Sequence, residues 1–253
     1  MDLQLKGKKA IVTGGTRGIG RRVAERLADE GCDVAICARN DVLVEETVKA
    51  LESRGVRAFG RALHVKNADA YRGFLEASCD FLGGLDILIL NVSAGGGMDS
   101  EKNWNRNFDV DVMSVVRGVE TTLPWLKKSP AASIVMTGTM AARETFVAPM
   151  AYNSLKAAIV AYSQQLAQQL IKRNIRVNCV SPGPTIFEGS AWEMVQLASP
   201  RTYNSVIRKH PARRMATADE IANCILFIAS PAASWVVGVD FLADGGFTKG
   251  VHF

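Results

Sequence analysis

The feature that most constrains this fold is the regular alternation of short apolar runs with longer segments of helical periodicity. The apolar runs are rich in valine and isoleucine and mostly lack polar alternation, which is typical of strands buried on both faces. Strands are expected at Ala10–Thr13, Val34–Cys37, Asp86–Leu90, Ser133–Thr137, Arg176–Val180 and Val236–Ala243, with a weaker one near Ala58–Leu63. Helices are expected between them, including Arg21–Glu30, Val42–Ser53, Ala70–Leu82, Asn107–Leu126 and Tyr152–Ile171. Repeated strand–helix units imply right-handed crossovers, so the sequence predicts a parallel, doubly wound α/β sheet.

The sequence shows no boundary between domains. Hydrophobic residues make up 48% of the 253 residues, enough for one sizeable core, and no Pro/Ser-rich linker, repeat or low-complexity tract divides them. We therefore expect one domain that spans residues 1–253. Within it, residues 185–213 break the alternation, contain Pro200 and Pro211, and show no obvious strand. This segment is long enough to form a mobile lid over a site.

Composition excludes several classes of function. The net charge of +5 is modest, and the basic residues are scattered without interleaved aromatics, which argues against a nucleic-acid surface. Five cysteines without a Cys-x-x-Cys pair indicate reduced thiols, with neither a disulfide framework nor a metal site. The chain starts without a recognisable signal peptide, and no apolar stretch approaches the ~20 residues that span a bilayer. A cytoplasmic protein without membrane association is expected.

A glycine-rich turn, TGGTRGIG, directly follows the first expected strand. Its glycines permit a tight turn, a close approach to a phosphate and close packing of the next helix on the strand. The start of that helix presents free N–H groups and the positive end of its dipole to a pyrophosphate. In this strand–turn–helix setting the turn predicts a nucleotide site made of Gly14, Thr16, Arg17, Gly18, Ile19 and Gly20.

The end of the second expected strand selects between the nicotinamide cofactors. In many dinucleotide folds an acidic residue about 20 positions past the glycines binds the ribose 2′-hydroxyl of NAD. Here Arg39 and Asn40 occupy this place. A carboxylate would repel a 2′-phosphate, whereas Arg39 can bind it bidentately and Arg17 can approach it. The charges of Arg17 and Arg39 therefore predict NADP(H). The alternative is that both arginines are merely solvated. Asp41 is interpreted as the cap of the next helix and not as a ribose ligand.

Tyr152 and Lys156 are four residues apart in the expected helix Tyr152–Ile171, so their side chains can point into one space. Such a pair occurs by chance in many helices, and spacing alone does not make it reactive.

Five motifs, in this order, resemble those of the short-chain dehydrogenase/reductase family: TGGTRGIG, NVSAG at Asn91–Gly95, Tyr152-x-x-x-Lys156, SPGP at Ser181–Pro184 and ADGG at Ala243–Gly246. The resemblance covers essentially the whole chain and is strongest to NADP-preferring members similar to 3-oxoacyl-[acyl-carrier-protein] reductase. It implies a single-domain Rossmann-type fold, with a seven-stranded parallel sheet flanked by helices. It also implies a nicotinamide cofactor and a homo-oligomer, commonly a tetramer or dimer.

The resemblance implies catalytic roles for four residues. Tyr152 would exchange the proton with the substrate oxygen, while Lys156 favours its phenolate form and binds the nicotinamide ribose. Thr139 replaces the usual serine that holds the substrate oxygen; the alternative is an ordinary buried threonine. Asp111 replaces an asparagine, so it loses two N–H donors and can carry a charge. It is expected either to pair with Lys156 through water and preserve a proton relay, or to hold that lysine too firmly.

The resemblance also assigns cofactor contacts to Val65, Asn91, Pro182, Gly183 and Thr185, in addition to Tyr152 and Lys156. His64 takes the place of an aspartate that faces the adenine, and we assign it no catalytic role. Phe187 takes the place of a threonine that often contacts the carboxamide, so Thr185 either substitutes for it or only packs.

The sequence therefore predicts an NADP-dependent oxidoreductase (EC 1.1.1.-) that transfers hydride between nicotinamide and a small carbonyl or secondary alcohol substrate. The alternative is an NADP-binding sensor or scaffold with weak or lost catalysis, for which Asp111 is the best support. An enoyl reductase is less consistent, because those relatives generally space the tyrosine and lysine further apart. Specificity is expected in Gly95–Asn105 and Phe187–Pro211, where apolar surface comes from Trp192, Met194, Val195, Leu197 and Tyr203.

Overall fold

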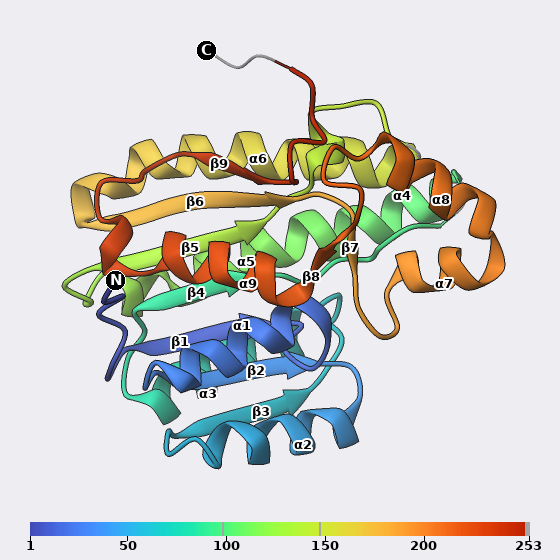
Figure 1. Cartoon of the computed structure of the whole chain (residues 1–253). Helices are drawn as coiled ribbons and strands as arrows, with labels where there is room; N and C mark the ends of the chain where they lie inside the picture. Colours follow the sequence, from blue (N-terminus) through green and yellow to red (C-terminus); the bar gives the residue numbers. More distant parts are fainter. Residues whose placement is uncertain (98, 147, 251–253) are drawn as a thin grey trace.

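A seven-stranded parallel sheet forms the centre of the molecule (Figure 1). The computed structural model describes residues 1–97, 99–146 and 148–250. The strand order is β3-β2-β1-β4-β5-β6-β9. The strands are β1 Lys9–Thr13, β2 Asp33–Ala38, β3 Ala58–Ala62, β4 Ile87–Leu90, β5 Ala132–Thr137, β6 Ile175–Pro182 and β9 Asp240–Ala243. The order reverses between β1 and β4, which creates a crevice at their carboxyl ends. The predicted α/β, Rossmann-type fold with seven parallel strands is confirmed.

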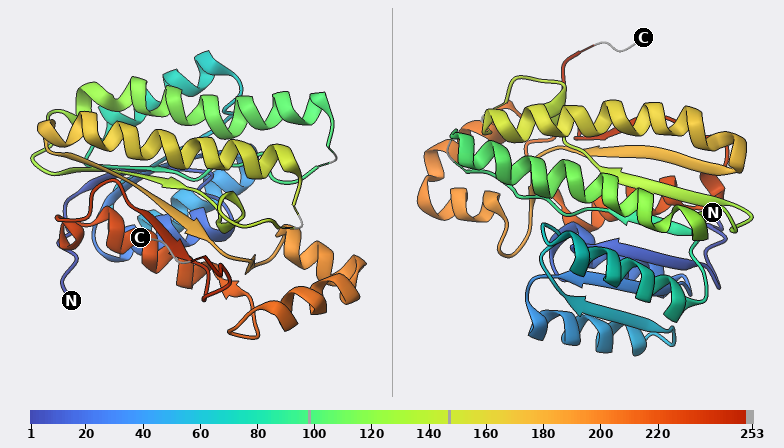
Figure 2. Two further views of the ribbon diagram at one scale, coloured as in Figure 1. Left: turned by 90° about the horizontal axis from the view of Figure 1, so that it is seen from above. Right: turned by 180° about the vertical axis from the view of Figure 1, so that it is seen from behind.

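Helices cover both faces of the sheet (Figure 2). One face carries α1 Gly18–Asp29, α2 Asp41–Glu52 and α9 Ala218–Ala229, and the other carries α3 Ala68–Leu82, α5 Ser114–Leu126 and α6 Met150–Leu170. Alternate strand residues supply the two cores: Ile11 of β1 packs with α3, α5 and α6, whereas Val12 packs with α1 and α9. Burial on both faces explains the unbroken apolar runs in the strands. Within the described residues, no helix has the length and apolar character needed to cross a membrane.

The expected helix Asn107–Leu126 is not a continuous α-helix. Helix α4 covers Glu101–Asn107, a π-helix follows at Phe108–Met113, and α5 begins only at Ser114. A π-helical turn holds one more residue than an α-helical turn and is frequent at functional sites. It shifts the side chains that follow it, and it places Asp111 against α6.

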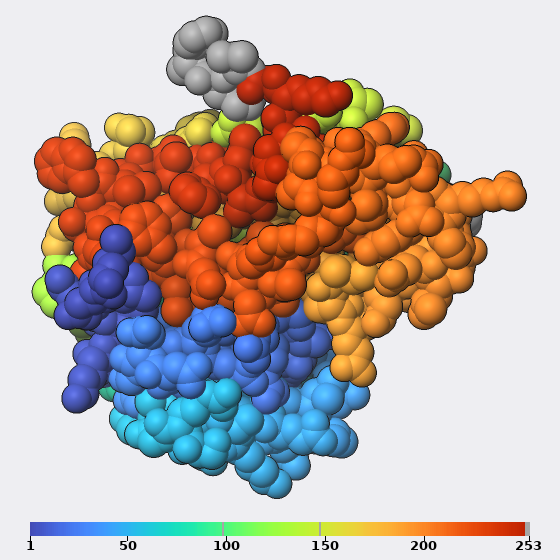
Figure 3. Space-filling model, viewed as in Figure 1, coloured from blue at the N-terminus to red at the C-terminus, as the bar shows by residue number. Residues whose placement is uncertain are grey.

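The segment 185–213 contains a strand and two helices, so the expectation that it lacks a strand was wrong. Strand β7, Thr185–Ile186, pairs in parallel with β8, Ala216–Thr217, and α7 Ala191–Ala198 and α8 Pro200–Lys209 follow β7. Two-residue strands are too short to produce a periodic pattern, which is why sequence alone misses them. Figure 3 shows α7 and α8, in orange, projecting from one side of the molecule.

The last strand also begins later than expected. Residues 236–239 lie outside β9, because Gly238 has a φ of +71° and its N–H bonds to the carbonyl of Val177 ahead of the strand. Positive φ interrupts an extended strand, and glycine adopts it without steric cost.

Candidate active site

The glycine turn links β1 to α1 at the carboxyl edge of the sheet. Gly14 N donates to Cys37 O at 2.8 Å, which ties the turn to the end of β2. Arg17 is the N-cap of α1, and its side chain makes no capping bond. Arg21 N donates to Arg17 O at 3.2 Å, so the three N–H groups at the start of α1 point ahead of the helix. Such groups form a ready binding site for an anion.

Close packing leaves no room for a side chain at Gly15 or Gly20 of this turn. A methyl group on Gly20 would lie 2.3 Å from Gly14 O and 2.5 Å from Asn91 Nδ2, and one on Gly15 would lie 2.6 Å from Ile36 Cγ2. The backbone of the turn is therefore pressed against the ends of β2 and β4.

Gly20→Ala should therefore lower the free energy of unfolding by about 3 kcal/mol, because the methyl group meets backbone atoms that cannot move away. Gly73→Ala in α3 is the matched control: nothing lies within 4 Å of its added methyl group, and it should be neutral or stabilising by up to about 1 kcal/mol. Urea unfolding of both variants measures the difference. Equal stability of the two variants would contradict the packing of the turn.

Asn91 holds three strand ends together. Its backbone N–H donates to Thr13 Oγ1 at 2.9 Å, its Nδ2 donates to Thr13 O at 3.3 Å, and its Oδ1 accepts from Thr137 Oγ1 at 3.3 Å. The side chain therefore connects β1, β4 and β5 below the glycine turn. This gives Asn91 a structural task beside the predicted contact with the cofactor.

Lys156 is buried between α6, β5 and the π-helix. Its Nζ donates to Thr137 O at 2.9 Å and lies 3.2 Å from Asp111 Oδ1. The side chains of both ionic partners are almost fully buried, at 4% and 1% exposure. Asp111 Oδ2 accepts from Ala94 N at 3.0 Å. Of the two alternatives for Asp111, the ion pair through water was wrong, because the π-helical turn carries the carboxylate into direct contact with the ammonium.

Burial disfavours the charged form of Lys156, but the charge of Asp111 and the nearby Tyr152 outweigh it. The pKa of Lys156 is therefore raised above its ordinary value. Tyr152 is half-buried and lies one turn earlier on the same helix. The structure thus places Asp111 against Lys156, whose raised pKa keeps it positively charged at neutral pH one turn from Tyr152.

Thr139 lies two residues beyond the carbonyl that Lys156 binds. It is the N-cap of a short 3-10 turn, Met140–Ala142, and its Oγ1 accepts from Ala141 N at 3.3 Å. The hydroxyl proton is not used in that contact and remains available for a substrate oxygen. The capping role and the predicted catalytic role are compatible.

Arg17 and Arg39 are both exposed, at the ends of β1 and β2. The neighbouring Arg21 and Arg22 are different, since Arg21 pairs with Glu25 and Arg22 pairs with Asp219.

The cap of α2 is Asn40, whose side chain accepts from Leu43 N at 3.0 Å. Asp41 is the first residue of that helix, so its interpretation as the cap was wrong. Asn40 satisfies the same backbone group as aspartate would. Its amide nitrogen is left for the predicted cofactor contact.

Phe187 lies on the glycine turn, a contact that the sequence did not reveal. A methyl group on Gly18, where φ is +53°, would lie 2.3 Å from Phe187 Cε2. Thr185 is buried in β7 and donates its hydroxyl to Gly183 O at 3.0 Å, which supports a packing role for it. Gly183 itself packs on Asp244.

The apolar residues expected to shape the substrate site divide into two groups. Trp192 and Tyr203 pack into a small cluster around Met140 and Phe247, whereas Met194 and Leu197 are 61% and 79% exposed. The other segment, Gly95–Asn105, contains Met98, which lies outside the described residues.

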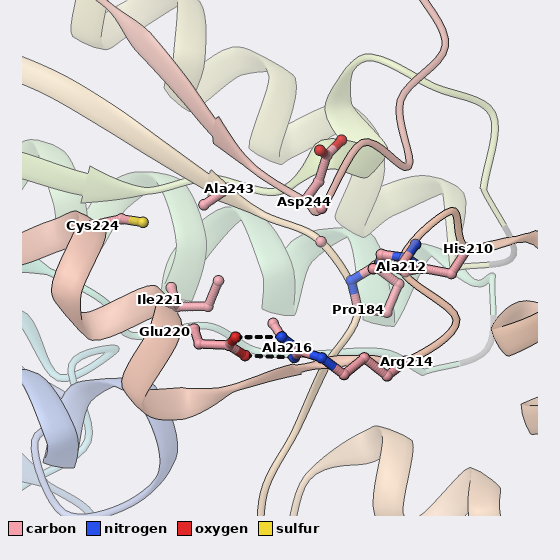
Figure 4. Close-up of a pocket in the computed structure, with 12 residues that line it drawn as sticks. Pro184, His210, Ala212, Arg214, Ala216, Glu220, Ile221, Cys224, Ala243 and Asp244 are labelled. Carbon is pink, nitrogen blue, oxygen red and sulfur yellow. Dashed lines mark hydrogen bonds and ion pairs between the residues drawn. The ribbon is translucent and has the colours of Figure 1, made fainter.

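A pocket of about 210 Å³ lies beside the turn at Gly183–Pro184 (Figure 4). Arg214 crosses it to Glu220 with two contacts of 2.7 and 2.6 Å, and this hydrogen-bonded pair lowers the pKa of Glu220 to about 2. Its lining comes from the turn after α8, β8, α9 and the end of β9, not from α6. Neither Tyr152 nor Lys156 lines this pocket, whereas Gly183, one of the predicted cofactor residues, does.

Known proteins resemble this chain over nearly its whole length. Residues 14–248 match a family model described as "Enoyl-(Acyl carrier protein) reductase". "Dehydrogenase/reductase SDR family member 4" of Oryctolagus cuniculus is 32% identical, over 96% of this chain and 94% of its own. The chain belongs to the short-chain dehydrogenase/reductase family. The isoepoxydon dehydrogenase patN of Penicillium expansum is 36% identical over 98% of both chains.

A solved member of this oxidoreductase family has the same fold. The L-sorbose reductase from Gluconobacter frateurii, complexed with NADPH and L-sorbose, superposes with a TM-score of 0.92 at 30% identity, covering 99% of this chain and 100% of its own.

In this short-chain dehydrogenase/reductase, the predicted site residues gather at one edge of the sheet. The glycine turn follows β1, Arg39 and Asn40 follow β2, Val65 follows β3, and Asn91 follows β4. Pro182 ends β6 on the other side of the strand reversal. The carboxyl edge at such a reversal is where open α/β sheets bind their ligands.

Proposed function

We propose that this chain is an NADP(H)-dependent oxidoreductase that transfers hydride between nicotinamide and a carbonyl or secondary alcohol. The observation that carries the proposal is the buried Lys156 ammonium, held by Thr137 O and Asp111 one turn from Tyr152 on α6. A fixed charge beside a phenol has a clear chemical use, because it stabilises the phenolate that remains after proton transfer.

The residues at the carboxyl edge fit a dinucleotide. Gly15 and Gly20 hold the turn close to the sheet, and the start of α1 offers N–H groups to a pyrophosphate. Bound NADP(H) would supply or accept the hydride. The chain's own residues would do the rest: Thr139 orients the substrate oxygen, Tyr152 exchanges its proton, and Lys156 stabilises the phenolate.

The cofactor preference is argued from Arg39, which is exposed at the end of β2 where a carboxylate would select NAD. The L-sorbose reductase, which binds NADPH, supports the same cofactor.

Arg39→Asp should lower the ratio of NADPH to NADH affinity about 100-fold, because a bidentate contact becomes a repulsion. Arg173→Asp makes the same charge change at the opposite edge of the sheet, just before β6, and should leave the ratio unchanged. Fluorescence titration with both nucleotides measures the ratios. If the ratio of NADPH to NADH affinity in Arg39→Asp stays at the wild-type value, Arg39 does not bind the 2′-phosphate.

Two other functions predict different assay results. A substrate panel that includes L-sorbose with NADPH and isoepoxydon with NADP⁺, followed by absorbance of the reduced nicotinamide, should show turnover. Tight NADPH binding without turnover on any substrate would instead favour the sensor or scaffold. Reduction of an enoyl thioester alone would favour the enoyl reductase, against which the four-residue spacing of Tyr152 and Lys156 argues.

The lid role of residues 185–213, the homo-oligomer and the cytoplasmic location remain predictions. The contact between Phe187 and Gly18 supports the first of them, because it places the start of this segment directly over the turn that would bind the pyrophosphate.

A further inference from the structure

His64 lies beside Arg39 at one corner of the sheet edge. Strands β2 and β3 pair in parallel with Ala38 opposite Ala62, and Leu63 N donates to Ala38 O at 2.7 Å. Arg39 directly follows Ala38, His64 directly follows Leu63, and both side chains are exposed. The corner is the adenosine end of the proposed cofactor site, because the residue after β2 is the one that meets the ribose 2′ position.

One backbone contact determines which nitrogen of His64 is free. Lys66 N donates to His64 Nδ1 at 3.1 Å, so Nδ1 is the acceptor and the proton of the neutral ring lies on Nε2. Partial burial, the charge of Arg39 and the charge of Lys66 lower the pKa of His64 and keep the ring neutral. The Lys66 ammonium is in turn 3.0 Å from Asp109 of the π-helix.

A ring in this state can offer only an N–H donor to a ligand. Adenine has neutral ring nitrogens that could accept from it, but its exocyclic amine is a donor and finds no acceptor there, whereas every oxygen of a phosphate is a charged and therefore stronger acceptor. The adjacent guanidinium of Arg39 also requires an acceptor, and a phosphate has several oxygens to share between two donors. The chemistry of this corner therefore fits a phosphate monoester better than an adenine edge.

We propose that His64, through Nε2–H, binds the 2′-phosphate of NADP(H) together with Arg39. The proposal rests on the proposed function, since it concerns the cofactor of that same site. It makes His64 a second determinant of cofactor preference, with a role distinct from catalysis.

His64→Ala in the full chain should weaken NADPH binding about tenfold and leave NADH binding unchanged, because the lost donor serves only the group that NADH lacks. His64→Gln is the matched control, since its side-chain amide keeps an N–H donor and should retain most of the NADPH affinity. Fluorescence titration gives dissociation constants for both nucleotides without turnover.

The double variant with Arg39→Ala tests whether the two residues share one ligand group. If they do, the combined loss of NADPH affinity should differ from the product of the two single losses. An equal loss for NADPH and NADH, or no loss in His64→Ala, would overturn the proposal. If the wild-type chain bound neither nucleotide, the proposed function itself would be wrong, which is a separate and recognisable outcome.

Discussion

Tyr152→Phe should lower kcat by roughly 10²–10⁴-fold, the usual contribution of a general acid or base, while the dissociation constant of NADPH changes little. The phenylalanine ring keeps the packing of α6 and leaves Lys156 bound to Thr137 O and Asp111. Only the hydroxyl that exchanges the proton is removed. The experiment combines steady-state kinetics on an active carbonyl substrate with a fluorescence titration of NADPH.

Tyr162→Phe provides the control for this variant. Tyr162 lies on the same helix, about 15 Å further along at 1.5 Å per residue, and packs against the core of α5 and α6. The Tyr162→Phe variant also loses a tyrosine hydroxyl, but far from the site, and it should keep nearly full activity. Undiminished turnover in Tyr152→Phe, or equal losses in both variants, would refute the catalytic assignment.

The sheet could be predicted because its strands bury both faces. Runs such as Ile11–Val12 and Ile87–Leu90 have no polar alternation, and both faces are covered by helices. The two-residue strands β7 and β8 could not be predicted, because they depend on a tertiary contact between residues about 30 positions apart. The π-helix was equally hidden, since one extra residue in a turn leaves the apolar periodicity almost intact.

Only those features of the site that depend on the spacing of residues along the chain could be predicted from the sequence. The four-residue spacing of Tyr152 and Lys156 is a property of one helix, and the structure preserves it. The direct contact of Asp111 with Lys156 depends on the π-helical turn, and the position of Phe187 depends on how β7 leaves the sheet. Both are contacts between distant segments, so no local pattern records them.

Asp111→Ala should lower the free energy of unfolding at neutral pH by about 3–5 kcal/mol. Removing one partner of a buried ion pair leaves the other charge without compensation, and the Lys156 side chain is 4% exposed. Asp111→Asn should lose much less, because the amide oxygen still accepts from Ala94 N and faces the ammonium with a dipole. Urea unfolding of the three proteins gives the comparison.

The pH dependence of the unfolding free energy follows from the direction in which the pKa of Lys156 is shifted. In the wild type its pKa is raised, so the stabilisation is complete below the ordinary lysine value of about 10.4 and is lost as the pH rises through the folded value. Without Asp111 burial dominates and the folded pKa falls below the ordinary value. The stability gap between wild type and Asp111→Ala should therefore narrow as the pH rises. A gap that stays constant up to pH 10 would contradict the ion pair.

Turnover of Asp111→Asn decides what the carboxylate does for catalysis. Lys156 donates to Thr137 O and contacts Asp111, which leaves it one N–H for a ribose hydroxyl. If the carboxylate restrains the ammonium too strongly, the asparagine variant should turn over faster than the wild type, with an unchanged NADPH dissociation constant. If the charge instead holds Lys156 protonated and in place, the variant should be slower, and the alkaline limb of its pH–rate profile should move to lower pH. We expect the second result, because the raised pKa of Lys156 depends on this charge.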